Sequence, residues 1–147
     1  MVGRDLYNEE HRSSSREETV LEVRDFNSKK FHDVSFKLKR GEVLCFAGLA
    51  GAGRTEVARA IIGADPLESG ELYIRGKRRK IANPEQAIEN GIGYLPEDRK
   101  EQGLFLEMAI SKNIVSGNLD SVAKKQIINE KSVLRVSEQY REKLRII

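Results

Sequence analysis

Residues 48–55, G-L-A-G-A-G-R-T, constrain the fold more than any other part of this chain of 147 residues. They follow the pattern G-x-x-x-x-G-K-[S/T] of loops that cradle phosphate groups, except that Arg54 stands where the pattern has lysine. Glycines allow backbone amides to approach phosphate oxygens without a Cβ in the way. The pattern therefore predicts a strand that enters the loop and a helix that leaves it.

The segments on both sides of the loop have the expected character. The apolar run 43–47, V-L-C-F-A, is typical of a short strand buried on both faces, with Cys45 as a small buried hydrophobe. The segment 54–63 is predicted to be a helix that stops at Gly63. Its apolar stripe consists of Val57, Ala60 and Ile61. This context favours nucleotide binding over a glycine-rich turn without a ligand.

The rest of the chain alternates strands and helices, which predicts an α/β fold. Strands are predicted at 20–23, 34–39, 69–77 and 92–96. A helix is expected to begin at Pro84, with Asn83 as its cap and Gln86 reaching back, and to end at Gly91. From Ser111 onward the pattern is helical. One face of 121–145 carries Val133, Val136, Tyr140 and Leu144, predicted as core packing, or as partly exposed if the chain is truncated.

Composition excludes several classes of protein. One cysteine permits no disulfide within the chain, no apolar run approaches the roughly 20 residues that cross a bilayer, and residues 1–19 lack the apolar centre of a secretory signal. These features predict a cytoplasmic protein. The basic run 75–80 is interpreted as a solvated surface, and no nucleic acid partner is expected, because the net charge is only +3 and no aromatic residues interleave with it.

Motifs that other phosphate-loop enzymes need are missing. Neither N-K-x-D nor D-x-x-G, the marks of small GTPases, occurs in the sequence. No apolar strand ending in Asp, which would hold Mg²⁺, follows the loop. The sequence thus predicts phosphate binding without a second metal anchor, either in a degenerate site or in a chain that has been cut short.

Two separated stretches carry a family resemblance. The stretches LKRGEVLCFAGLAGAGRTEVARAIIGADPLESGELYIRGK and GIGYLPEDRKEQGLFLEMAISKNI resemble the ATP-binding cassette of ABC transporters. Their G-A-G-R-T-E and P-E-D-R variants are similar to the second, degenerate cassette of double-cassette monosaccharide importers of the ribose, galactose and xylose group. The resemblance implies a P-loop NTPase core with a mixed sheet and helices, truncated before the signature loop.

The resemblance also divides the chain and assigns roles. It implies an inter-cassette linker or flexible tail at 1–19 and a partial nucleotide-binding domain at 20–147, with no catalytic residue. ATP and Mg²⁺ are the implied cofactors, with Thr55 and Glu97 at the metal. Phe26 and Phe31 are the aromatic residues near the adenine position, although neither aligns well. The implied nucleotide-binding residues are Gly48, Gly51, Ala52, Gly53, Arg54, Thr55 and Glu56.

Two departures from the family pattern imply weak hydrolysis. Arg54 replaces a compact ammonium by a planar fork, and Glu97 stands where the family has glutamine. A carboxylate there can still bind Mg²⁺, but it adds negative charge near the γ-phosphate.

The resemblance further implies part of the ATP-binding subunit of a sugar importer, with ribose as the expected sugar, at the inner face of the membrane. Its expected partners are membrane-spanning permease subunits, the other cassette and, indirectly, a periplasmic sugar-binding protein. Residues 101–113 lie where the family meets its membrane subunit, and the apolar residues among them are expected to be either contacts or core: Leu104, Phe105, Leu106 and Met108. The alternative is a regulatory module that binds a nucleotide or an anion without a role in transport.

Overall fold

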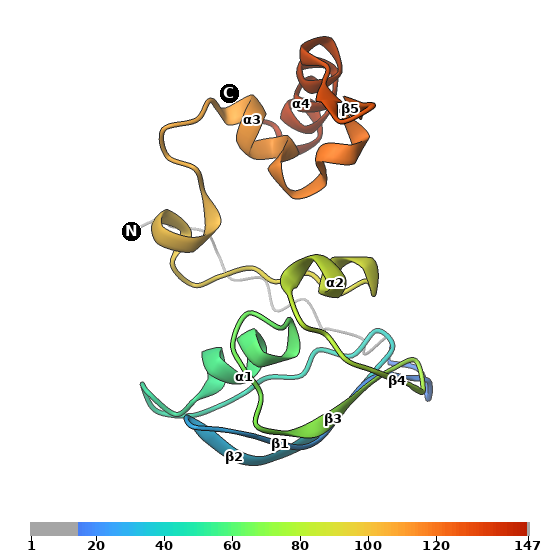
Figure 1. Ribbon diagram of the computed structural model, residues 1–147, viewed down its shortest axis with the longest axis vertical. Helices are drawn as coiled ribbons and strands as arrows, with labels where there is room; N and C mark the ends of the chain where they lie inside the picture. Colours follow the sequence, from blue (N-terminus) through green and yellow to red (C-terminus); the bar gives the residue numbers. More distant parts are fainter. Residues whose placement is uncertain (1–14, 147) are drawn as a thin grey trace, which may run out of the picture. The chain divides into compact units, whose positions relative to one another are not determined.

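The chain forms two compact units, which divide between Tyr94 and Leu95. The structure, a computed structural model, describes residues 15–146 (Figure 1). Within this range no helix is long and apolar enough to cross a bilayer.

The amino-terminal unit is built on a four-stranded antiparallel sheet in the order β2-β1-β3-β4. Its strands are β1 Thr19–Ser28, β2 Phe31–Lys39, β3 Ser69–Ile74 and β4 Lys77–Arg79. The short turn of Lys29 and Lys30 joins the first two strands. The register of β1 shifts between Val23 and Phe26, where Asp25 takes a left-handed conformation (φ 50°). This irregularity lets both apolar side chains face the core.

Helix α1, Arg54–Ile61, covers one face of this sheet (Figure 1). Its predicted apolar stripe is confirmed, because Val57, Ala60 and Ile61 are all buried. Full burial of each large apolar side chain contributes about 1.5–3 kcal/mol, and Phe26 is the largest of the fully buried side chains. The core consists of Val23, Phe26, Phe31, Val57, Ala60, Ile61 and Leu72.

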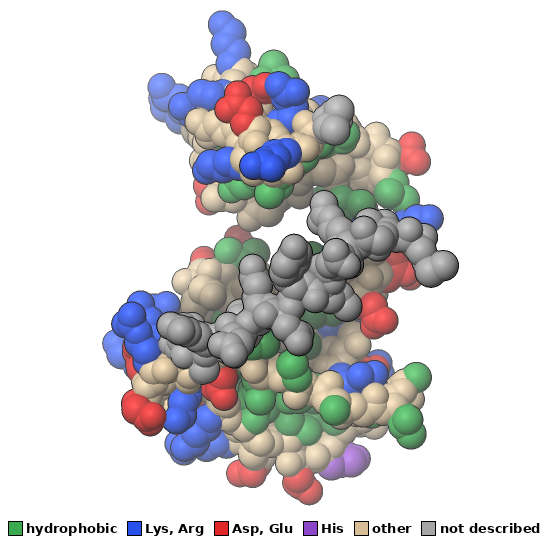
Figure 2. Space-filling view, turned by 180° about the vertical axis from the view of Figure 1, so that it is seen from behind, with side chains coloured by type: hydrophobic (Ala, Val, Ile, Leu, Met, Phe, Trp, Pro, Cys, Tyr) green, Lys and Arg blue, Asp and Glu red, His purple; other side chains and the backbone are tan. Residues whose placement is uncertain are grey.

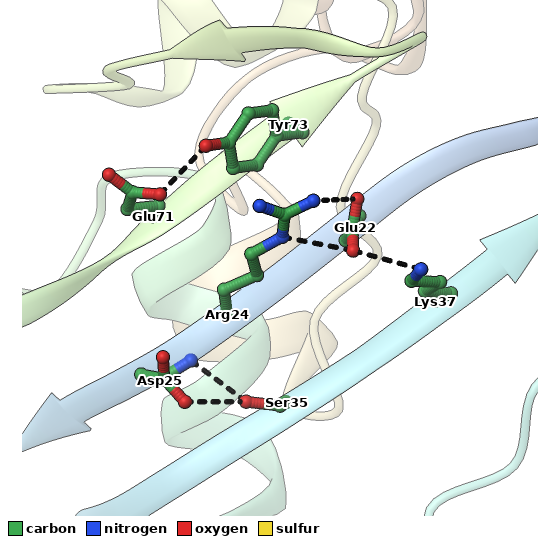
Figure 3. A network of polar contacts seen from close by, with 7 residues as sticks. All are labelled: Glu22, Arg24, Asp25, Ser35, Lys37, Glu71 and Tyr73. Carbon is green, nitrogen blue, oxygen red and sulfur yellow. Dashed lines mark hydrogen bonds and ion pairs between the residues drawn. The ribbon is translucent and has the colours of Figure 1, made fainter.

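Polar side chains cover the opposite face of the sheet (Figure 3). Arg24 donates two hydrogen bonds to Glu22, both at 3.0 Å, and its guanidinium lies 4.3 Å from the ring centroid of Tyr73. Lys37 lies 3.2 Å from the same carboxylate, and the Tyr73 hydroxyl donates to Glu71 at 2.7 Å. Because side chains alternate along a strand, this network lies on the face away from α1.

Helix α2, Pro84–Glu89, confirms the predicted cap. The Asn83 side chain accepts a hydrogen bond from the Gln86 amide at 2.9 Å, and the Gln86 side chain accepts one from the Ala82 amide at 2.9 Å. The helix therefore begins where its sequence provides acceptors for its first free amides.

The carboxy-terminal unit has a smaller core, made of Val115, Val122 and Val133. The Ser137 hydroxyl, also buried, donates to the Val133 carbonyl at 2.8 Å. Its elements are a π-helical turn Arg99–Gly103, α3 Ile110–Val115, a 3₁₀ turn Ser116–Ser121, β5 Ala123–Lys124, β6 Ile127–Ile128 and α4 Glu130–Leu144. The predicted apolar face of α4 is buried only in part, because Tyr140 and Leu144 are exposed.

Two predicted strands do not form. Residues 43–47 and 92–96 adopt no strand, and Cys45, expected to be buried, is exposed. A strand buried on both faces needs hydrogen-bonded neighbours and a covering layer on each side. No segment within 15–146 pairs with 43–47, although the Phe46 ring packs edge-on against Phe36 at 5.1 Å. Hydrophobic side chains consequently appear at the surface of both units (Figure 2).

Candidate phosphate-binding site

Two glycines in the left-handed region shape the loop that precedes α1. Gly51 has φ 80° and Gly53 has φ 81°, a conformation that residues with a Cβ rarely adopt. Between them, the Ala52 amide donates to the Leu49 carbonyl at 3.1 Å, which closes a tight turn. The loop therefore reverses the chain immediately before the helix begins.

The surroundings of Gly53 also leave little room for a side chain. A Cβ at this position would lie 3.3 Å from the Lys30 carbonyl oxygen and 3.4 Å from the Phe31 Cβ. At Gly48, a Cβ would lie 3.0 Å from the Ala52 Cβ. The loop thus packs against its own turn and against the β1–β2 turn, and these contacts fix the start of α1.

The first backbone amides of α1 have no acceptor. Gly53 is the N-cap residue and no side chain caps the helix. The amides of Gly53, Arg54, Thr55 and Glu56 make no hydrogen bond to another residue within 15–146. Unpaired amides at a helix start, together with the positive end of the helix dipole, favour an anion. The helix start agrees with the glycine pattern, whereas the strand that the pattern predicts before the loop does not form.

The side chains around these amides differ in their exposure and in their interaction partners. Arg54 is exposed, and its Nη2 donates to the Leu49 carbonyl at 3.3 Å, so its fork closes the loop on itself. Thr55, the second residue of the helix, is exposed. Glu56 is half-buried, and its Oε1 lies 3.6 Å from the Nζ of Lys30. The predicted nucleotide-binding residues thus share one loop and one helix start.

The predicted metal ligands come from different units. Thr55 belongs to the amino-terminal unit and Glu97 to the carboxy-terminal one, so their joint binding of Mg²⁺ stays a prediction. Glu97 is exposed, next to Asp98, whose carboxylate accepts from the amides of Lys100 and Glu101 at 2.9 and 3.1 Å. Within the described range no three His, Cys, Asp or Glu side chains are grouped to hold a metal ion.

The two aromatic residues near the adenine position cannot stack on a base. Phe26 is 1% exposed and Phe31 is 7% exposed, and both belong to the core under α1. Sequence reasoning missed Lys30, which lies directly before Phe31 in the turn that packs on the loop. No local signal in the sequence marks it, because its place beside the loop depends on how the β1–β2 turn packs on Gly53.

A separate recess of about 870 Å³ lies between the segment after α1 and the β3–β4 strands. Acidic and basic side chains line it together, and Arg78 pairs with Glu71 at 3.0 Å. Such mixed charge favours no particular class of ligand. The recess does not include the loop before α1, residues 48–53, which we call the glycine loop.

The carboxy-terminal unit presents an apolar loop, defined here as residues 104–109. It is held by Asn113 of α3, whose side-chain oxygen accepts from the Phe105 amide at 2.8 Å. The Asn113 amide group donates to the carbonyls of Phe105, Met108 and Ala109 at 2.9, 3.2 and 3.3 Å. The expectation of a contact surface fits this arrangement better than that of a core, because Leu104, Phe105, Leu106 and Met108 are 49–64% exposed.

The sequence is similar to those of several known proteins. The chain is 46% identical to a putative ribose/galactose/methyl galactoside import ATP-binding protein of Albidiferax ferrireducens, over 99% of this chain and 30% of that protein. It is 43% identical to a ribose import ATP-binding protein of Bacillus subtilis, over 89% of this chain and 27% of that protein. It is also 43% identical to a ribose import ATP-binding protein of Rubrobacter xylanophilus, over 99% of this chain and 30% of that protein. The chain thus spans less than a third of the length of these relatives.

A family model described as ABC transporter matches residues 31–146, a range that contains both the glycine loop and the apolar loop. This match confirms the predicted fold class, although the four-stranded sheet of the described residues is antiparallel rather than mixed. The resemblance predicted from the two sequence stretches is also confirmed. The chain belongs to the ABC transporter family.

Proposed function

We propose that the chain forms part of the ATP-binding subunit of an importer for a monosaccharide, with ribose as the best candidate. The observation that carries the proposal is the row of unpaired amides at the start of α1, in a chain of the ABC transporter family. The names of its relatives support the choice of sugar import, since they refer to ribose and galactose import. They do not favour a regulatory module without a role in transport.

The residues present fit the phosphates of Mg·ATP. The amides from Gly53 to Glu56 offer donors to phosphate oxygens, and Arg54 adds positive charge beside them. The Thr55 hydroxyl and the Glu97 carboxylate are the oxygen ligands that Mg²⁺ prefers, and we assign both to the metal. Gly48, Gly51 and Ala52 shape the loop. Hydrolysis of ATP would supply the free energy for import in the complete protein.

Hydrolysis at this site is proposed to be weak. The Arg54 fork donates to a carbonyl of its own loop, so less of it is available to a γ-phosphate than a lysine ammonium would be. Glu56 and Glu97 bring carboxylates toward a ligand that is itself strongly negative. We assign no catalytic residue within the chain.

The apolar loop is the proposed contact with the membrane-spanning permease subunits. Its support is the exposure of Leu104, Phe105, Leu106 and Met108 on a segment whose backbone Asn113 holds. A second cassette and, indirectly, a periplasmic sugar-binding protein complete the proposed assembly, which places the chain at the inner face of the cell membrane. The predicted linker at 1–19 lies mostly outside the described residues.

Titration calorimetry with ATP and Mg²⁺ tests the proposal. The wild-type chain should bind ATP, and Arg54→Ala should weaken binding at least about tenfold, because it removes a charge beside the phosphates and the contact that closes the loop. Arg79→Ala is the matched control. It removes the same charge from an exposed position on β4 and should change the affinity less than about twofold.

Two results would contradict the proposal. One is a wild-type chain that binds neither ATP nor inorganic tripolyphosphate, since the amide row would then hold no anion. The other is an equal loss of affinity in the two arginine variants, which would assign binding to net charge rather than to the loop.

A further inference from the structure

Lys30 occupies a fixed position beside the glycine loop. Its amide donates to the Ser28 hydroxyl at 3.1 Å, and Ser28 is itself buried. Its carbonyl packs against Gly53 so closely that a Cβ there would approach it to 3.3 Å. The β1–β2 turn is therefore anchored on one side to the sheet and on the other to the start of α1.

Glu56 places a negative charge among the donors of the proposed phosphate site. It is the third residue of α1, so its own amide is one of those without an acceptor within 15–146. A carboxylate in this place opposes the approach of an anion. Lys30 provides the opposite charge, with its Nζ 3.6 Å from Oε1 of Glu56.

The other charged groups nearby have partners of their own. The pKa of Asp65 is lowered mainly by hydrogen bonds from Arg59 and to a smaller extent by the charge of Lys30. Arg59 holds that carboxylate at 2.8 and 2.9 Å. Arg54 is bound to the Leu49 carbonyl. Among these groups, Lys30 is the cation that forms an ion pair with Glu56. The pKa of Arg59 is raised mainly by Asp65 and to a smaller extent by the charge of Glu56.

We propose that Lys30 is a positioning residue of the phosphate site, which offsets the charge of Glu56 so that this carboxylate does not cancel the positive charge that Arg54 and the unpaired amides present to a triphosphate. The inference rests on the proposed function. It adds a residue from a distant turn, which the glycine pattern does not contain, and it gives the Glu56 side chain a role opposed to binding, while the Glu56 amide remains a donor.

The test compares two adjacent lysines in the 147-residue chain. Binding of sodium tripolyphosphate and of ATP is measured by calorimetry at about 50 mM salt, where the Debye length exceeds 10 Å. Lys30→Ala should weaken both affinities by about threefold to tenfold, and Lys30→Arg should restore them. Lys29→Ala, in the same turn and also exposed, should change them less than about twofold.

A double-mutant cycle separates the charge effect from a structural one. Glu56→Gln alone should tighten binding about threefold, and in its background Lys30→Ala should cost less than about twofold, because the carboxylate is gone. A loss from Lys30→Ala that persists undiminished in the Glu56→Gln background would overturn the inference. So would equal effects of the two lysine variants in a chain that binds tripolyphosphate. A wild-type chain that binds neither ligand would instead overturn the proposed function, and this inference with it.

Discussion

The glycine loop and the apolar loop are both exposed, but different interactions hold their backbones in place. At 48–53, left-handed glycines and close packing on the β1–β2 turn fix the backbone, and the amides that follow are left unpaired. At 104–109, one asparagine side chain satisfies backbone groups on Phe105, Met108 and Ala109, and the apolar side chains are left uncovered.

This difference indicates what each loop can bind. Unpaired donors at a helix start are suited to an anion, because an anion completes hydrogen bonds that the protein does not make. A loop with satisfied backbone and uncovered apolar side chains is suited to an apolar protein surface instead. The same chain therefore presents two candidate binding surfaces, one with unpaired backbone donors and one with uncovered apolar side chains.

The largest effect should come from Asn113→Ala. It removes four hydrogen bonds to the apolar loop and should lower the free energy of unfolding of the carboxy-terminal unit by about 2 kcal/mol. The Phe105 amide should also lose its protection from hydrogen exchange. Urea unfolding and exchange measured by mass spectrometry check both effects.

The matched control is Asn129→Ala, which removes the cap of α4, where the Asn129 side chain accepts from the Ser132 amide at 3.0 Å. It should cost about 1 kcal/mol and leave the protection of Phe105 unchanged. Retained protection in Asn113→Ala would show that the apolar loop is held by something other than this side chain.

A smaller effect is expected from Gly53→Ala. The left-handed conformation alone should cost about 1–2 kcal/mol, and the added methyl would also press on the Lys30 carbonyl. Binding of tripolyphosphate should fall at least about tenfold, because the start of α1 must shift.

Gly76→Ala is the control, since Gly76 has φ 74° and a methyl group there would meet no atom within 4 Å. It should show similar strain and unchanged binding, and a loss of binding there would undermine the special role of Gly53.

The smallest effect concerns two ion pairs and acid pH. The pKa of Asp65 is lowered by hydrogen bonds from Arg59, so this pair adds stability above the ordinary aspartate pKa, which is lost as the pH falls through the lowered value. Unfolding should be followed between pH 7 and pH 3. Asp65→Asn should reduce the acid-induced loss of unfolding free energy by less than about 1 kcal/mol. Glu138→Gln on α4 should change it less, because the Glu138–Arg141 pair is more exposed. A larger change in this loss from Glu138→Gln than from Asp65→Asn would contradict the prediction that the less exposed ion pair has the larger effect.

Local signals in the sequence predicted the parts of the fold that local physics determines. The stripe of Val57, Ala60 and Ile61 and the cap at Asn83 are both present, because each depends on neighbours within a few residues. The strand at 43–47 failed because its stability depends on hydrogen-bonded neighbours, which no sequence window displays.

The candidate site divides in the same way. The glycine pattern predicted a loop whose amides are unpaired, since glycine conformation and helix starts are local properties. Lys30 and Asn113 could not be identified, because the first acts across a turn that packs on Gly53, and the second reaches back to Phe105, eight positions earlier. Contacts of this kind depend on how the chain returns to itself.

The exposed thiol of Cys45 has a practical consequence for the segment 43–47. It is the only sulfhydryl group in the sequence, and it lies within the apolar run whose backbone pairs with nothing in the described part of the chain. A thiol-reactive dye would therefore label one position, and its rate of attachment would fall once another polypeptide covered that run. The chain thus carries an intrinsic reporter within an apolar run that belongs to no sheet of the described residues.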